Sequence, residues 1–209
     1  MILAAIETAA EAHGLIVMGI SPSDEGACIL LGAGSDLWPI FQASDEALDG
    51  LADPLDRWSK RVIGDLAKTH SGVAKFPSDG PPYLPFIQWA KNSGRFWQSP
   101  TGMLIHDEAG LMISIRGAIF LPGVSVTAPT GPSPCESCTE KPCLTACPVS
   151  ALSGSAPYDV PACKSHIRSD AGAACMSDGC LTRRACPVSQ SFGRDPAQSS
   201  FHMRAFVGA

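Results

Sequence analysis

The sequence predicts an α+β fold, with a mixed domain over residues 1–125 and a small cysteine-rich domain over residues 135–209. Two observations support this prediction. In the first part, amphipathic helical stretches alternate with short β-type runs, which is typical of a layered domain of helices and sheet. In the second part lie eight of the nine cysteines of the chain. The stretch between them, residues 126–134, is rich in proline and is expected to be a linker.

The elements of the first part follow from periodicity and from turn residues. Residues 2–13 have apolar positions at helical spacing, and Gly14 is expected to end that helix. Asp53 and Pro54 form a helix start, because aspartate caps helices and proline fits the first turn, and this helix is expected to reach His70. Further helices are predicted over residues 36–43 and 84–91, and strands over residues 15–20, 27–34, 73–76, 102–106 and 111–121, the last two joined by a turn at residues 107–110.

Composition and charge exclude several classes of protein. Hydrophobic residues make up 45% of the chain and charged residues only 17%, which argues against a disordered protein. No apolar run reaches the roughly 18 residues that span a membrane, and the apolar N-terminus contains Glu7 and Glu11 and lacks the basic segment of a signal peptide. No long basic run indicates nucleic-acid binding. We therefore expect a cytoplasmic protein without a membrane partner, in which thiols stay reduced.

The cysteines of the second part form two groups, and each group ends in Cys-Pro. The first has the spacing C-x₂-C-x₄-C-x₃-C-P and the second C-x₁₁-C-x₄-C-x₅-C-P. Thiolates are the ligands of iron–sulfur clusters, and each [4Fe–4S] cluster takes four. In the familiar two-cluster arrangement, the cysteine before proline crosses to the other cluster. Applied here, this arrangement predicts two ligand sets: Cys135, Cys138, Cys143 and Cys186 on cluster 1, and Cys147, Cys163, Cys175 and Cys180 on cluster 2.

Other uses of the cysteines stay open at this point. Tetrahedral zinc also binds closely spaced cysteine pairs, although zinc sites usually lack two Cys-Pro endings. Disulfides would need a secreted protein, and no feature of the sequence indicates secretion. The ninth cysteine, Cys28, lies among apolar residues of a predicted strand and is expected to belong to the core.

The arrangement from Cys135 to Cys186 resembles the dicluster ferredoxin module of epoxyqueuosine reductase and of reductive dehalogenases, which delivers electrons to a corrinoid. Residues 78–123, which contain GMLIH and ISIRGAIFLPG, are similar to the segment ahead of the clusters in epoxyqueuosine reductase and still more to cobalamin-processing proteins of the CblC type. The resemblance implies a flavin-reductase-like α+β fold for residues 1–125, with cobalamin as the cofactor and FMN as a less favoured one. It does not extend to the helical repeats of the tRNA enzyme, so tRNA is not expected as a partner.

Two residues outside the cysteines are candidates for the site. Asp79 stands in a D-x-x-P-x-L context, and the resemblance implies that it is catalytic, because an aspartate in this context donates a proton in epoxyqueuosine reductase. A turn-forming role before two prolines is the alternative. Arg116 lies within a predicted strand, where a charge must face solvent, a partner or a ligand, so it is a candidate for cofactor binding. His106 is expected to be a turn residue, with metal ligation or proton donation as the alternative.

These observations favour a redox protein. Two clusters would pass electrons to a corrinoid held by residues 1–125, with an electron donor such as flavodoxin or ferredoxin reductase as the partner. The protein would then act as a corrinoid-dependent reductase on a small molecule or on the corrinoid itself. Two alternatives remain: a ferredoxin-like carrier whose first domain is only a docking module, and a flavin-dependent reductase.

Overall fold

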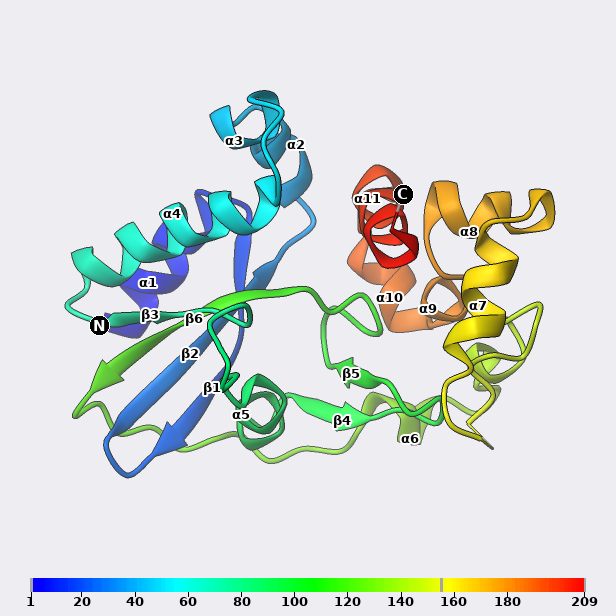
Figure 1. Ribbon diagram of the computed structural model, residues 1–209. Coiled ribbons are helices and arrows are strands. Elements are labelled where there is room, and N and C mark those ends of the chain that lie inside the picture. Colours follow the sequence, from blue (N-terminus) through cyan, green and yellow to red (C-terminus); the bar gives the residue numbers. More distant parts are fainter. Residues whose placement is uncertain (1, 155, 209) are drawn as a thin grey trace. The chain divides into compact units, whose positions relative to one another are not determined.

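The computed structural model describes residues 2–154 and 156–208 (Figure 1). It is a mixed helix and sheet protein, which confirms the α+β class. The chain divides into two compact units, each built from two segments. Unit 1 comprises Met1–Phe96 and Ser114–Gly131, and unit 2 comprises Trp97–Ile113 and Pro132–Ala209. Among the described residues, no helix has the length and apolar character needed to cross a membrane.

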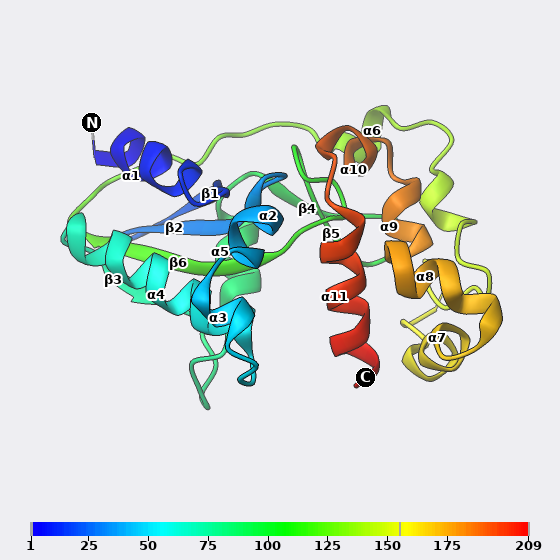
Figure 2. The ribbon, with the colours of Figure 1, turned by 90° about the horizontal axis from the view of Figure 1, so that it is seen from above.

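Unit 1 is organised around a four-stranded antiparallel sheet in the order β1-β2-β6-β3. The strands are β1 (Leu15–Ser23), β2 (Gly26–Ala33), β6 (Ile115–Pro122) and β3 (Val73–Lys75). Strand β2 is buried along its whole length, so both faces of the sheet are covered. Figure 1 shows α1 (Ile2–Glu11) and α4 (Pro54–Thr69) on one side of the sheet and α5 (Phe86–Asn92) on the other, and Figure 2 shows α1 and α4 lying over the strands.

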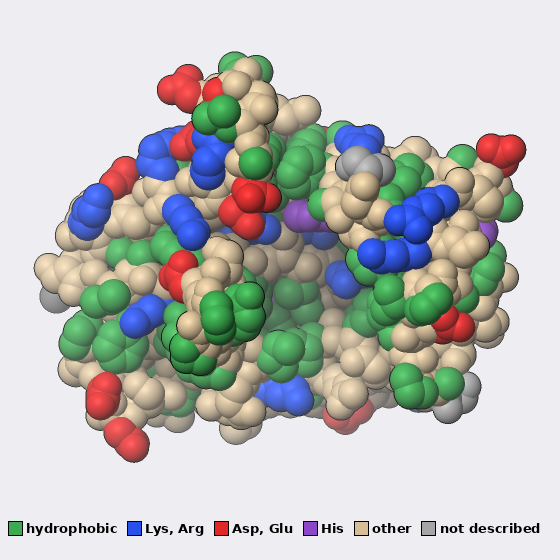
Figure 3. Space-filling model, in the orientation of Figure 1, with side chains coloured by type: hydrophobic (Ala, Val, Ile, Leu, Met, Phe, Trp, Pro, Cys, Tyr) green, Lys and Arg blue, Asp and Glu red, His purple; other side chains and the backbone are tan. Residues whose placement is uncertain are grey.

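Helix α4 contributes an apolar stripe to this core. Its apolar residues lie at helical spacing and are all buried: Leu55, Trp58, Val62, Ile63 and Leu66. The expected cap is wrong in its detail: Asp53 has a left-handed backbone, with φ of 51°, and its side chain makes no capping hydrogen bond. The neighbouring short helices are α2 (Leu37–Gln42) and α3 (Asp45–Leu48). Figure 3 shows acidic and basic side chains interspersed over α3 and α4.

Unit 2 begins with a segment that the prediction had assigned to the first domain. Strand β5 (Leu104–His106) pairs with β4 (Phe96–Gln98), whereas the expected strand over residues 111–121 starts only at Ile115, in β6. The reason is that Leu111 is held within unit 2. Its backbone N–H donates to Ser189 Oγ at 2.8 Å, and its carbonyl accepts from Arg183 Nη1 at 2.6 Å. Residues 97–113 therefore belong to unit 2, whereas the sequence analysis placed them in a first domain that ends at residue 125.

The turn in this segment comes close to a helix of unit 2. Gly110 has φ of +58°, and a Cβ added to it would lie 2.4 Å from the backbone nitrogen of Ser189. Glycine is suited to both conditions, since it adopts positive φ readily and leaves room for the other backbone.

The rest of unit 2 is a set of short helices. They are α6 (Pro134–Ser137), the 3₁₀ turns η1 (Pro142–Leu144) and η2 (Asp170–Gly172), α7 (Val160–Ile167), α8 (Ala173–Asp178), α9 (Leu181–Ala185), α10 (Pro187–Phe192) and α11 (Pro196–Val207). Helix α11 packs against α8, so the chain after Arg194 folds back onto its own unit. Helices this short are marginal in water on their own, which means that contacts between them must stabilise the unit.

Candidate functional site

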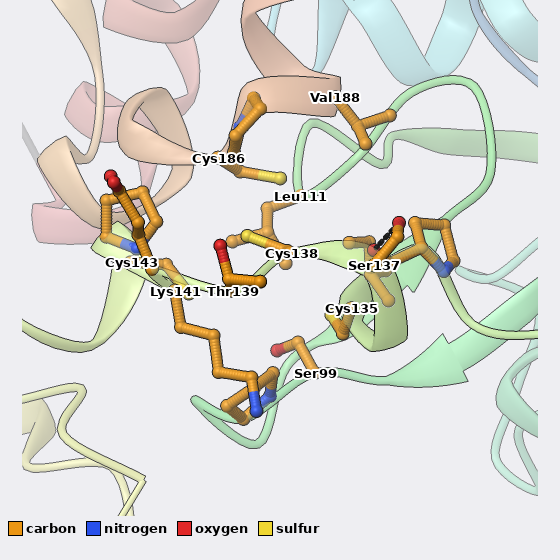
Figure 4. A pocket seen from close by; sticks show the side chains of 16 residues that line it. Ser99, Leu111, Cys135, Ser137, Cys138, Thr139, Lys141, Cys143, Cys186 and Val188 are labelled. Atoms are coloured by element: carbon orange, nitrogen blue, oxygen red, sulfur yellow. Dashed lines mark hydrogen bonds between the residues drawn. The ribbon is translucent and has the colours of Figure 1, made fainter.

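One cavity of unit 2 is lined by four cysteines. Its volume is about 360 Å³, and Figure 4 shows the sulfur atoms of Cys138 and Cys186 pointing into it. The four residues, named here the first thiol set, are Cys135, Cys138, Cys143 and Cys186. The first three come from the segment of α6 and η1, and the fourth stands at the junction of α9 and α10. The fold thus brings residues that are far apart in the sequence to one cavity.

Local sequence explains how these cysteines are positioned. Ser133 and Glu136 form a capping box at the start of α6, and the backbone N–H of Cys135 donates to Ser133 Oγ at 3.2 Å. Lys141 has φ of 45°, which turns the chain into η1 and presents Cys143. Pro187 stands at the first turn of α10, where proline is tolerated because that N–H has no helical partner. The Cys186-Pro187 pair therefore marks the change of direction between two helices.

The surroundings of the first thiol set are apolar. Ile105 and Leu111 form a buried cluster with Cys143 and Cys186, and Trp97 packs against it. Burial raises the pKa of the Cys135 and Cys143 thiols, and the neighbouring cysteines of the set raise it further. A raised pKa disfavours free thiolates, whereas a bound metal deprotonates a coordinating thiol outright. Four thiols line this one cavity, and four is the number of thiolates that a [4Fe–4S] cluster takes.

The other four cysteines form the second thiol set: Cys147, Cys163, Cys175 and Cys180. Cys163 lies in α7 and Cys175 in α8. Burial raises the pKa of both thiols, and the other cysteines of the set raise it further. Cys175 belongs to an apolar cluster with Ile167 and Val207.

Four of the eight cysteines thus line one cavity, and the other four influence one another electrostatically; that these are the ligand sets of two clusters stays a prediction. That an iron–sulfur cluster fills each set stays a prediction. All nine cysteines are free thiols. Within residues 2–154 and 156–208, no group of three or more His, Cys, Asp or Glu side chains is arranged to hold a metal ion. Cys28 is a buried core residue of β2, as expected, and burial raises its pKa to about 12.

Asp79 has a local structural role in unit 1. Its carboxylate accepts a hydrogen bond from the backbone N–H of Phe76 at 3.1 Å and lies 3.5 Å from Lys60 Nζ. The side chain is 44% exposed, and two cis peptide bonds, Gly80-Pro81 and Pro81-Pro82, follow it. These contacts are those of a turn-forming residue. Proton donation by Asp79 is untested and stays a prediction.

Arg116 has partners within unit 1. Its side chain is 12% exposed, and its guanidinium pairs with Asp56 of α4. Its Nε also donates to Ser59 Oγ at 3.1 Å. Strand β6 and helix α4 are thus joined by this residue. Cofactor binding by Arg116 stays a prediction beside this structural role.

We expect Arg116→Ala to lower the free energy of unfolding of unit 1 by about 1–3 kcal/mol, because Asp56 and the buried Ser59 hydroxyl lose their partner. Urea unfolding followed by tryptophan fluorescence measures this loss. The matched control is Lys68→Ala, which removes an exposed ion pair to Asp65 in the same helix and should cost less than about 1 kcal/mol. Unchanged stability of the Arg116 variant would contradict the structural role and favour a ligand-binding one.

His106 is a buried turn residue of unit 2. Its Nδ1 accepts hydrogen bonds from the backbone N–H groups of Glu108 and Ala109, at 3.2 and 3.1 Å. Its Nε2 lies 3.2 Å from Asp107 Oδ1. An Nδ1 that accepts carries no proton, so the turn holds one tautomer of the ring.

Tyr158 is a site residue that sequence reasoning missed. Burial raises the pKa of its hydroxyl above the usual value, and the neighbouring Cys163 side chain raises it further. The available signal was the position of a tyrosine five residues ahead of a predicted ligand, in a chain with only two tyrosines. His166, three residues after Cys163, has a buried Nε2 that finds no hydrogen-bond partner among the described residues.

Comparison with known proteins adds no relative to this description. No protein-family model matches the chain, and no curated protein sequence matches it.

Proposed function

We propose that unit 2 is an electron-transfer module that holds two [4Fe–4S] clusters. The observation that carries this proposal is the convergence of four thiols from separate segments on one cavity, with the other four thiols grouped nearby in the same unit. The first thiol set would hold cluster 1 and the second thiol set cluster 2. When bound, such clusters supply one-electron redox chemistry, with potentials from about −700 to +450 mV.

The residues around each set would control water access and charge. Ile105, Leu111 and Trp97 exclude water from part of the first set, and low solvent exposure is one of the factors that set a cluster potential. Lys141 lines the same cavity and can offset the negative charge of four thiolates. Each transfer would move one electron from a reduced donor protein, such as a flavodoxin or a ferredoxin reductase, into unit 2 and on to an acceptor. This chemistry needs a reducing compartment such as the cytoplasm.

The acceptor that the resemblance implies is a corrinoid bound by a flavin-reductase-like unit 1. Unit 1 contains a cavity of about 410 Å³ beside α1 and β1, lined in part by Glu7, Ser93 and Arg95. This volume is at the lower end of the range for drug-sized ligands, and a corrinoid with its nucleotide is larger. The cavity therefore does not fit a whole corrinoid.

Anaerobic purification followed by iron and sulfide analysis tests the proposal. We expect about eight iron and eight sulfide per chain, four of each per cluster, and visible absorbance that bleaches with dithionite. Zinc in place of iron, or iron for less than one cluster, would contradict the proposal. Titration of the loaded protein with hydroxocobalamin and with FMN then identifies the acceptor. Binding of neither would favour the ferredoxin-like carrier.

A further inference from the structure

Another cavity of unit 2 lies apart from the thiols that the proposed function uses. Its volume is about 460 Å³, which is within the range of small-molecule sites. It is lined by residues of α8, α9, α10 and α11, so separate segments of the chain contribute to it. The eight cysteines of unit 2, all of which the structure describes, are not among its lining residues. The cavity is therefore a separate site from the two thiol sets.

The walls of this cavity are held together by contacts between the helices. Helix α11 packs against α8. A Cβ added to Gly179, just after α8, would lie 2.6 Å from Cβ of Ser199 in α11, so the two segments meet closely there. Gln190 Nε2 donates to the backbone carbonyl of Arg184 at 3.1 Å, which joins α10 to α9. A ligand would thus enter a cavity that is already formed, which lowers the entropic cost of binding.

Three charged side chains line the cavity: Arg184 of α9, Arg194 from the turn between α10 and α11, and Asp178 of α8. Arg184 Nη1 lies 3.5 Å from Asp178 Oδ2 and makes no hydrogen bond within the part of the chain that the structure describes. The side chains of Arg184 and Asp178 are 38% and 43% exposed, so the cavity opens to solvent beside them. Two positive charges and one negative charge leave a net charge of +1.

We infer that this cavity binds a small organic carboxylate. One carboxylate neutralises the net charge of +1, and a guanidinium can donate two parallel hydrogen bonds to its oxygens. A phosphate group carries a charge of about −2 and would place excess negative charge beside Asp178. The body of the ligand packs against the apolar side chains of the lining, Met112, Leu181 and Pro196, and this burial adds to the affinity. The inference goes beyond the proposed function and does not depend on what the thiols bind.

Isothermal titration calorimetry of the full-length, anaerobically purified protein with benzoate tests this inference. Benzoate combines one carboxylate with an apolar ring, and we expect it to bind with a dissociation constant below about 1 mM. Benzyl alcohol has a similar shape without the charge, and inorganic phosphate has the charge without the apolar body. Both should bind at least about tenfold more weakly than benzoate, because each lacks one of the two contributions.

Two variants change the charge of the cavity in opposite directions. Arg184→Met removes the guanidinium and keeps a long unbranched side chain, and it should weaken benzoate binding about tenfold to a hundredfold. Asp178→Asn removes the carboxylate that competes for Arg184, and it should strengthen benzoate binding about two- to fivefold. The matched control is Arg204→Met, which alters an exposed arginine of α11 that is not among the lining residues and should leave the affinity unchanged.

Three results would overturn the inference: no binding of benzoate by the wild-type protein, binding of benzyl alcohol or phosphate as tight as that of benzoate, or equal affinities in Asp178→Asn and the wild type. The wild-type and Asp178→Asn measurements decide the question even if Arg184→Met does not fold. Iron analysis of the same preparation tests the proposed function separately. Benzoate binding without iron would refute only the clusters, and full iron without benzoate binding would refute only this site.

Discussion

Replacing Cys186 by serine is expected to remove one cluster and to leave the other, so that the iron content falls from about eight to about four per chain. Cys186 is 5% exposed and lies in the buried apolar cluster with Cys143, where a serine hydroxyl is a poor ligand for iron. Iron analysis and electron paramagnetic resonance of the anaerobically purified variant measure the loss. Cys28→Ala is the matched control, because Cys28 is an equally buried cysteine of unit 1, and this variant should keep all its iron.

The same experiment tests how the two sets are composed. Cys143 and Cys147 are close in sequence but belong to different thiol sets, and the same holds for Cys180 and Cys186. The variants Cys143→Ser and Cys186→Ser should therefore retain the same cluster, identified by its midpoint potential and spectrum. Cys147→Ser and Cys180→Ser should both retain the other one. If Cys143→Ser and Cys147→Ser instead lost the same cluster, the composition of the two thiol sets would be wrong.

Removing iron is expected to unfold unit 2 while unit 1 stays folded. The apolar clusters of unit 2 contain several of the cysteines predicted as ligands, among them Cys143, Cys175 and Cys186. Without bound iron–sulfur clusters, the short helices lose the groups that would join these buried cysteines. A ligand present at about a thousand times its dissociation constant contributes about 4 kcal/mol, so its loss should raise the population of the open form of unit 2 about a thousandfold.

Limited trypsin digestion with mass spectrometry measures this effect. After chelation of the iron, cleavage beside Lys164 and Arg183 should become much faster, whereas sites in α4 of unit 1, such as Lys60, should stay protected. Unit 1 is the internal control, because its buried sheet and its helices α1, α4 and α5 contain none of the eight ligands. Equal protection of both units before and after chelation would show that unit 2 is stable without metal.

Several elements of the fold could be predicted because the signals for them are local. Strand β2 is a continuous apolar run, which predicts a strand that is buried on both faces. Helix α4 has apolar residues at helical spacing, which predicts one buried face. The cysteine spacing is also a local signal, and the two ligand sets predicted from it stay a prediction. The expected cap at Asp53 failed because a residue type alone does not determine the backbone angle that a cap needs.

Other properties were decided only by the tertiary structure. The run from Leu111 to Leu121 reads as one strand, but Ser189 and Arg183 hold Leu111 in unit 2, and the strand starts at Ile115. β-propensity does not indicate whether a residue such as Leu111 will form its hydrogen bonds with a neighbouring strand or with other residues of the fold.

The same limit applies to the side chains of the site. That Arg116 pairs with Asp56 and that Tyr158 stacks on Phe206 depends on where separate segments meet. The sequence by itself determined which residues are candidates for the chemistry, because cysteine spacing and residue type are properties of the chain. Which hydroxyl and which charge stand beside them was decided by packing, since hydrogen bonds and ion pairs act over only a few ångströms and form between groups that the fold brings together.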